Sequence, residues 1–205
     1  KILVRNTRLS VTADVVEGLG TRWDARFLRM NSEVPQDSTV STQGRWVPFV
    51  KGGGYYKWTG RQWYCLDWKA DGARILNFKD DSGKLRSRPQ NRHYYFSNGL
   101  TYSAMAQGSL AVRKLESDTI AGDAGPMIVP RAQADYLAGV LNSRFVSYVL
   151  RMLSPTLQLK TGYVALTPLP VEADQTCIAE LAEICTSLKA VLISSDLTER
   201  KFDPQ

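Results

Sequence analysis

Residues 44–68, GRWVPFVKGGGYYKWTGRQWYCLDW, decide how the rest of the chain is organised. This stretch holds all but one of the five tryptophans, and its cations alternate with aromatic residues on both sides of a glycine run at residues 52–54. Aromatic and β-branched residues favour strands, and the glycine run and Thr59-Gly60 are turn signals. The stretch therefore predicts a β-hairpin.

Two interpretations of this hairpin fit its residue types. In the first, the aromatic side chains form a packed layer and the cations are solvated at its rim. In the second, the cations neutralise phosphates, and the glycines let the backbone approach a polyanion closely. Composition alone favours the first, because aromatic residues in strands usually serve packing. The remaining sequence adds weight to the second.

The positive charge is concentrated in the same region. The net charge of the chain is +6, and residues 45–92 carry eleven Lys/Arg against four Asp, a local net charge of +7. Residues 170–205 carry three Lys/Arg against seven Asp/Glu, a net charge of −4. This asymmetry indicates two surfaces with different roles, of which the basic one suits an anionic partner.

Composition and length exclude several classes of protein. The 205 residues, 43% hydrophobic and 22% charged, suit one globular domain, or one domain with an appendage. Three cysteines without CxxC spacing favour free thiols in a reducing cytoplasm, and the lone His93 argues against a zinc site or a His-dependent triad. There is no signal peptide and no membrane-spanning apolar run, so no membrane association is expected. The chain opens on KILVRN without a Met, so we expect a part of a longer protein.

Periodicity predicts the other elements. Strands are expected in residues 1–13 (KILV, then RLSVTA), 74–78, 110–115, 127–129 and 163–170, and a turn or short helix at 14–19. Residues 93–106 read as two strands broken at a hairpin turn, Asn98-Gly99. Residues 131–153 read as two helices separated at Asn142-Ser143, and Asp174 caps a final helix at 175–193. We therefore expect an α+β fold, mainly antiparallel short strands with a helical pair and a long C-terminal helix.

The final helix shows one apolar seam. Its members step by three and four positions and are Ile178, Leu181, Cys185, Leu188 and Leu192. An ordinary amphipathic helix is favoured over a coiled coil because the seam is short. We expect a domain at residues 1–170, followed by a helical segment at 171–205 that acts as a spacer or packs on a partner.

Two further segments are candidates for binding. In GLGTRWDARFLRM, residues 18–30, the glycines bracket a tight turn that either presents Thr21, Arg22 and Asp24 to a ligand or pairs Asp24 with a nearby arginine. The polar loop 79–91, KDDSGKLRSRPQN, is rich in cations and is either solvated surface or a place for binding residues. Phosphate-loop, dinucleotide, nucleophile-elbow and metalloprotease motifs are absent, as is the [DNS]PP[YFW] motif of amino-methyltransferases. From its residues alone, the chain reads as a binding module and not a catalyst.

Four motifs, taken in order, resemble one family. GLGTRWDARFLR (18–29), WVPFVKGGGYYKWTG (46–60), YYFSNGLTYSAMA (94–106) and YLAGVLNSRFVSYVLRMLSPTLQLKTGYVALTPLP (136–170) resemble segments of PglX-type adenine-specific DNA methyltransferases and of fused restriction-modification enzymes. Where that family has Gly-Asp-Asn after the Thr, this chain has Arg22, Trp23 and Asp24.

The resemblance implies a target recognition domain that follows an upstream methyltransferase domain. That upstream domain is the implied partner and carries S-adenosylmethionine, so no cofactor, metal or catalytic residue is expected in this chain. The second implied partner is double-stranded DNA, read in the major groove while the catalytic pocket handles one flipped adenine. The parent would act in restriction-modification or phage defence, with or without a nuclease. The ending also resembles the specificity subunits of type I restriction systems.

This reading assigns roles to individual residues. Phosphate contacts are expected from Lys51, Gly52, Gly53 and Lys57, with Arg22 and Arg45 in the same role. Base readout is expected from Arg86, Arg88, Gln90 and Arg92, and hydrogen bonds beside the groove from Tyr102 and Ser103. For each residue, the alternative is a structural or solvated role. For the whole chain, the alternative is a module that binds single-stranded nucleic acid or another protein.

Overall fold

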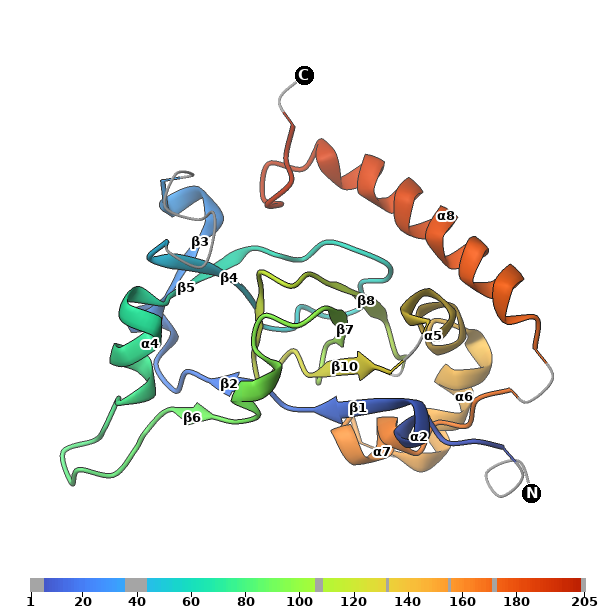
Figure 1. The fold of residues 1–205 in the computed structure, drawn as a ribbon, viewed down its shortest axis with the longest axis horizontal. Coiled ribbons are helices and arrows are strands. Elements are labelled where there is room, and N and C mark those ends of the chain that lie inside the picture. The colour runs from blue at the N-terminus through green and yellow to red at the C-terminus, as the bar shows by residue number, and fades with distance from the viewer. Residues whose placement is uncertain are drawn as a thin grey trace.

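The computed structural model describes residues 6–35, 44–105, 109–131, 133–154, 156–170 and 173–203. Within them the strands form two four-stranded sheets and one two-stranded pair, with helices arranged around them (Figure 1). Helices and mostly antiparallel strands are both present, which confirms the predicted α+β class.

The first sheet is antiparallel and has the strand order β1-β10-β7-β8. Its strands are β1 (Ala13–Val16), β10 (Met127–Pro130), β7 (Gly99–Tyr102) and β8 (Val112–Leu115). The helices that share its core are α2 (Leu9–Thr12), α5 (Ala134–Leu141), α6 (Arg144–Leu153) and α7 (Thr161–Ala165). This core buries Leu100, Tyr102, Leu137 and Leu150 almost completely. Burying such large side chains contributes about 1.5–3 kcal/mol each.

The second sheet has the order β3-β5-β4-β9 and a separate, aromatic core. Its strands are β3 (Leu28–Met30), β5 (Tyr64–Asp67), β4 (Trp46–Val50) and β9 (Ile120–Ala121), of which β4 and β9 pair in parallel. The helices α3 (Asp24–Phe27) and α4 (Lys69–Leu76) contribute to its core. Phe27 meets Phe78 edge-on, with ring centroids 5.1 Å apart. The short 3-10 helix η1 (Asn31–Glu33) follows β3.

The hairpin predicted from residues 44–68 is present, because β4 and β5 pair antiparallel from Trp46↔Asp67 to Phe49↔Tyr64. The segment that connects the two strands, residues 51–63, is long and does not form a tight turn; we call it the hairpin connection. Within it, the Trp58 amide donates to the Val112 carbonyl (2.8 Å), and the Lys114 amide donates to the Trp58 carbonyl (2.8 Å). The connection thus reaches the edge strand of the first sheet and joins the two sheets.

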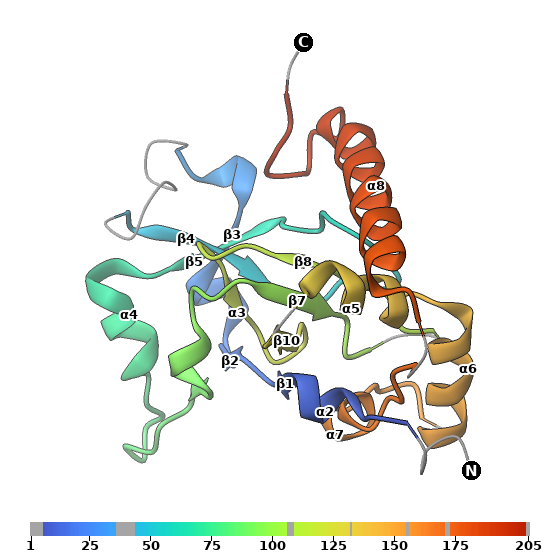
Figure 2. The ribbon, with the colours of Figure 1, turned by 45° about the vertical axis from the view of Figure 1, so that its right-hand side comes forward.

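The helical predictions near the C-terminus are also confirmed. The Ser143 hydroxyl caps α6 by accepting from the Val146 amide, and Asp174 caps α8 (Gln175–Ser194) by accepting from Cys177. Helix α8 lies against α5 (Figure 2). A Cβ added to Gly139 would lie 2.6 Å from Ile178 Cγ2, so the close approach of the two helices requires glycine there.

The apolar seam predicted on α8 divides between two environments. Ile178 and Ala182 face the core, whereas Leu181, Leu188 and Leu192 are 57–71% exposed. The Gly139 contact is thus made by Ile178 and Ala182, and the three leucines lie away from it.

Three predicted strands are helical turns instead. Of residues 74–78, the first three form the end of α4, after positive φ angles at residues 70–72, and residues 77–78 follow the helix. Arg74 donates to the buried Asp67 at 2.8 Å. Residues 9–12 form α2, and KILV lies outside the described residues. Residues 161–165 form α7, of which Val164 is fully buried. Short apolar runs fit either state, and tertiary packing decides.

Two turn predictions are also wrong. Residues 14–19 are mostly extended, in β1 and in β2 (Leu19–Gly20). Asn98-Gly99 does not form a hairpin, because the 3-10 helix η3 (Arg92–Tyr94) precedes it, and β7 pairs with β8 and β10. A Cβ on Gly99 would lie 2.7 Å from the Ile128 carbonyl oxygen, so this glycine permits a close strand contact.

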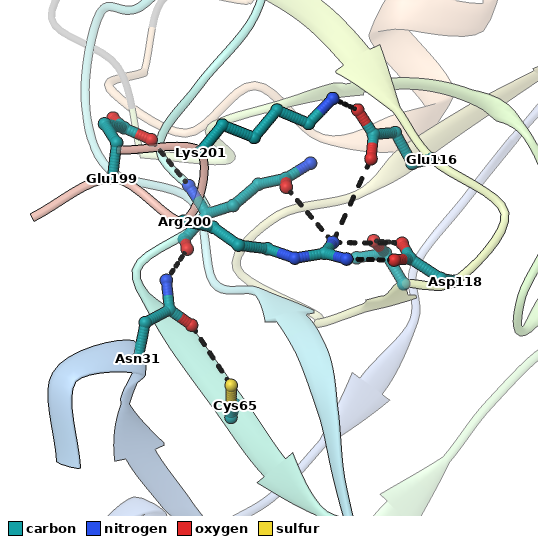
Figure 3. A network of polar contacts seen from close by, with 9 residues as sticks. Asn31, Cys65, Glu116, Asp118, Glu199, Arg200 and Lys201 are labelled. Carbon is teal, nitrogen blue, oxygen red and sulfur yellow. Dashed lines mark hydrogen bonds and ion pairs between the residues drawn. The ribbon is translucent and has the colours of Figure 1, made fainter. Parts of the chain in front are cut away.

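The C-terminal segment, residues 195–203, connects the end of α8 to residues 61–63 and to the turn at residues 116–118, through a network of polar contacts (Figure 3). The Glu199 carboxylate accepts hydrogen bonds from the Arg61 amide (2.9 Å), the Gln62 amide (3.4 Å) and the Trp63 indole (3.3 Å). Arg200 pairs with Asp118, and Lys201 with Glu116. Helix α8 is therefore anchored at both ends.

Candidate nucleic-acid interface

A two-stranded pair brings together two segments that lie far apart in the sequence. Strand β2 pairs antiparallel with β6 (Arg88–Pro89), in the register Leu19↔Pro89 and Gly20↔Arg88. The pairing sets the turn at residues 18–24 beside the basic loop, which projects below α4 in Figure 1. Two of the sequence-predicted binding segments thus form one surface.

The turn also packs closely on residues 121–123. A Cβ on Gly18 would lie 1.8 Å from the Ala121 carbonyl oxygen, and one on Gly20 would lie 2.8 Å from Asp123 Oδ2. Gly18 is therefore required for this approach, because the atom that it meets belongs to the backbone, whereas the Asp123 carboxylate can move away from a side chain at residue 20. Arg22 follows with φ 58°, a left-handed backbone that non-glycine residues rarely adopt.

An open pocket of about 370 Å³ lies where these segments meet β4. We call it the Lys51 pocket; its lining residues are Leu19, Thr21, Arg22, Asp24, Phe49, Lys51 and Asp123. Lys51 forms an ion pair with Asp24, and Arg22 forms one with Asp123 (Nη2 to Oδ2, 3.2 Å). Asp24 thus pairs with a lysine, not with an arginine as one interpretation of the turn expected.

The charges in the Lys51 pocket balance. Partial burial opposes ionisation of Asp24, but hydrogen bonds from Lys51 and Thr21 and the charge of Lys51 hold the pKa of this carboxyl below its ordinary value. The pocket therefore presents two cations that are each paired with a carboxylate. Asp123 was not singled out in the sequence, because nothing in AGDAGP signals that it lies beside Arg22.

An exposed tryptophan adjoins the pocket. Trp23 is 46% exposed, and the guanidinium carbons of Arg26 and Arg86 lie 5.3 and 5.6 Å from its ring centroid. The ring centroids of Phe78 and Trp23 are 5.9 Å apart. Cation–π contacts of this kind hold the ring in place. The sequence placed these residues in separate segments and did not predict the cluster.

The basic loop presents its arginines to solvent. Arg86, Arg88 and Arg92 are exposed, and Gln90 is half-buried. Asn91, with φ 51°, donates from its side chain to the Glu17 carbonyl at 2.8 Å and so anchors the loop end to the turn before β2. The predicted base-reading residues thus follow one another along a single loop and its β6 pairing.

Two buried side chains fix the backbone of the glycine run, residues 52–54. Its φ values are 89°, 133° and 77° at Gly52, Gly53 and Gly54. Arg113, fully buried, donates to the Gly52 carbonyl at 3.1 Å, and Ser103 donates to the Gly54 carbonyl at 2.7 Å. Burial lowers the pKa of Arg113 to about 10, and two of its nitrogens have no partner among the described residues.

The remaining predicted residues lie elsewhere. Arg45 pairs with Asp67 (3.0 Å) and stacks over Trp46. Lys57 donates to the Asn142 carbonyl at the end of α5 (2.7 Å). Tyr102 is fully buried in the first core, so the hydrogen bond expected from it beside a DNA groove does not fit its position. Ser103 is buried too, and its hydroxyl already donates to the Gly54 carbonyl.

Other kinds of site are not evident in the part of the chain that the structure describes. Among the described residues, no group of three or more His, Cys, Asp or Glu side chains is placed to hold a metal ion. No described helix combines the length and apolar character that crossing a membrane requires.

Comparisons with known proteins agree with the motifs. No protein-family model matches the sequence. The chain is 31% identical over 173 residues to the adenine-specific methyltransferase PglX of Lacticaseibacillus casei (strain Zhang), covering 79% of this chain and 14% of that protein. It is 25% identical over 161 residues to the adenine-specific methyltransferase BrxX of Escherichia coli O9:H4 (strain HS), covering 75% and 13%. The chain is related to these methyltransferases.

A solved structure has a similar fold. That of the Type IIL restriction-modification enzyme MmeI in complex with DNA aligns with a TM-score of 0.57 and 16% sequence identity, covering 92% of this chain and 29% of that one. At this identity the likeness concerns the fold alone. The chain spans only about one-seventh of the length of PglX or BrxX.

Proposed function

We propose that this chain is the DNA-sequence recognition module of an adenine-specific DNA methyltransferase in a restriction-modification or phage-defence system. The observation that carries the proposal is the β2–β6 pairing. It places the turn at residues 18–24 beside the basic loop, residues 79–91, on one exposed surface. The relation to PglX and BrxX, and the fold shared with MmeI, support it.

In this proposal the module binds duplex DNA and positions it for a catalytic domain outside the chain. Arg86, Arg88, Gln90 and Arg92 read base edges in the major groove, where arginine makes bidentate contacts with guanine. Lys51, Lys57, Arg22, Arg45 and the backbone of Gly52 and Gly53 contact phosphates and set the register. Phosphate binding by Lys51 exchanges its carboxylate partner for a phosphate, since Asp24 holds it in this structure.

S-adenosylmethionine belongs to the catalytic domain in this scheme. The Lys51 pocket is lined largely by two ion pairs, which do not suit the flat faces of the adenine ring of that cofactor. We therefore assign no chemical step to residues of this chain. Its contribution to methylation is the choice of site and the orientation of the duplex.

The upstream catalytic domain is also the proposed partner of α8. Leu181, Ile184, Leu188 and Val191 form a stripe at helical spacing that is 55–71% exposed. Exposed apolar stripes of this kind mark interaction sites.

The first test is binding of random duplex and single-stranded DNA, measured by fluorescence anisotropy across a salt series. Duplex affinity should fall steeply with salt, because phosphate contacts release counterions. Tighter binding to single strands would favour the alternative, in which exposed Trp23 stacks on unpaired bases. Absence of binding to either at low salt would contradict the proposal for this chain.

A pair of variants tests the division of labour, on a cognate site selected from a random duplex pool. Lys51→Ala should weaken cognate and random duplexes alike and reduce the salt slope by about 1. Arg88→Ala should weaken the cognate site preferentially, by about tenfold. Lys160→Ala, an exposed lysine at the start of α7, is the control. Equal losses on both duplexes for both variants would show that the roles are not divided.

A further inference from the structure

A second pocket, of about 370 Å³, lies between the hairpin connection and α6. We call it the Arg144 pocket; its lining residues are Tyr55, Lys57, Ser109, Arg144, Ser147, Tyr148 and Arg151. Four of these occupy one face of α6, at positions 144, 147, 148 and 151, which is the i, i+3, i+4, i+7 spacing of a helix surface. The opposite face of α6, with Val146, Val149 and Leu150, is buried in the first core.

The Arg144 pocket differs from the Lys51 pocket in its charge. It is lined by three cations and by no described carboxylate. Neither Lys57 nor Arg144 forms an ion pair with a carboxylate in the described residues. The Lys51 pocket sets two carboxylates against its two cations. The first turn of α6 adds its own positive end beside Arg144.

Existing contacts hold the cations in position. The side chain of Asn142 bonds both backbone groups of Val112 (2.8 and 2.9 Å), which fixes the α5–α6 junction to β8. Lys57 donates to the carbonyl of the same Asn142, at 2.7 Å, and its ammonium lies 5.4 Å from the Tyr55 ring centroid. Arg151 Nη2 donates to Ser109 Oγ at 3.0 Å, which leaves the Ser109 hydroxyl hydrogen free to donate to an acceptor.

The glycine run connects the two pockets. Lys51 lines the first pocket and Tyr55 the second, and four residues of chain span at most about 14 Å. Gly53 and Gly54, between them, are exposed, and the buried cation of Arg113 lies under Gly52. A polyanion that follows the glycine run from the Lys51 pocket therefore reaches the Arg144 pocket within a few phosphates.

We propose that the Arg144 pocket binds a backbone phosphate of the nucleic acid. The cations and the serine hydroxyls match the acceptor oxygens of a phosphodiester, and the guanidinium groups suit bidentate contact. Tyr55 and Tyr148, 58% and 63% exposed, stand beside the neighbouring sugar and base. The inference rests on the proposed function and extends it to α6.

The test is an Arg144→Gln/Arg151→Gln double variant of the chain. Its affinity for random and cognate duplex should fall equally, roughly tenfold, and its salt slope should drop by about 1. The control is Arg8→Gln/Lys160→Gln, which removes the same charge from two exposed residues outside the pocket. Matched circular dichroism and melting curves verify folding. Duplex binding equal to that of the control would overturn the inference.

A second measurement separates failure of this pocket from failure of the proposed function. Inorganic pyrophosphate is titrated into the wild-type chain while the Arg side-chain Nε–Hε signals are followed by NMR, and we expect shifts of Arg144 and Arg151 that are absent in the double variant. Shifts without any DNA binding would support the phosphate site but contradict the proposed function. Shifts with DNA binding unaffected by the double variant would indicate a small phosphate ligand and overturn the inference, as would the absence of shifts.

Discussion

Burial divides the three cysteines into different chemical environments. Cys177 is exposed, whereas Cys65 is 1% exposed and donates its S–H to Asn31 Oδ1 at 3.1 Å. Burial raises the pKa of the Cys65 thiol from 9.0 to about 11. The unfolded chain therefore ionises this thiol first as pH rises. Its contribution to stability is fully present below pH 9 and is lost as pH rises to about 11.

We expect the two cysteines to differ in alkylation. At pH 8, iodoacetamide should modify Cys177 readily and leave Cys65 intact, because the thiolate is the nucleophile and the Cys65 thiolate is both scarce and enclosed. Peptide mass spectrometry over time measures this, and the same reaction in urea, where both should react, is the control. Modification of Cys65 at the rate of Cys177 in the folded chain would contradict the burial described above.

Among the elements, α8 has two apolar faces. The inner face packs on α5 through Ile178 and Ala182, against Gly139. The outer face presents Leu188 and Val191, 62% and 71% exposed. An ordinary surface helix is polar on its outer side, so a second apolar stripe suits a helix that packs on a partner.

A charge on the outer stripe should therefore lower self-association of the chain. Leu188→Glu should reduce the weight-average sedimentation coefficient at high concentration and leave the melting temperature within a few degrees of wild type, since this side chain makes no core contact. Ser187→Glu adds the same charge at the neighbouring exposed position, off the stripe, and should change neither. Identical sedimentation of both variants and wild type would argue against a docking role for the stripe.

On the scale of the whole molecule, contacts distant in sequence hold the two sheets together. The hairpin connection reaches β8 through Trp58, and the C-terminal segment returns from α8 to the same connection. Glu199, 5% exposed, satisfies two backbone amides and an indole there. The predicted division into residues 1–170 and 171–205 stays a prediction, although these contacts cross the proposed boundary.

Removal of the Glu199 carboxylate should destabilise the whole fold. Glu199→Ala leaves buried donors without partners, which costs about 1–3 kcal/mol each when no water replaces the acceptor. Urea denaturation should show a loss of at least about 2 kcal/mol in the free energy of unfolding. Lys201→Gln removes only a 61% exposed partner from an ion pair and should change it by less than about 1 kcal/mol. Equal stability of the two variants would mean that the contacts of the C-terminal segment with the hairpin connection do not stabilise the fold.

The predictable features were local ones. Ser143 and Asp174 cap their helices because a capping side chain acts within three residues. The β4–β5 hairpin followed from strand-forming residues flanking a glycine break. Two predicted strands, residues 74–78 and 163–170, begin as helix at residues 74–76 and 163–165, because the state of such short runs depends on partners elsewhere in the chain.

The sequence by itself determined the α+β class, the long helices, the basic middle of the chain and the four motifs that relate it to adenine-specific methyltransferases. Each of these depends on residue type and on spacing along the chain. Only the tertiary structure decided that Lys51 is paired with Asp24, that Tyr102 is buried, and that Arg144 and Arg151 face Lys57 across a pocket. The reason is physical: the effect of a charge depends on which other charges surround it, and those neighbours come from distant segments that only folding brings together.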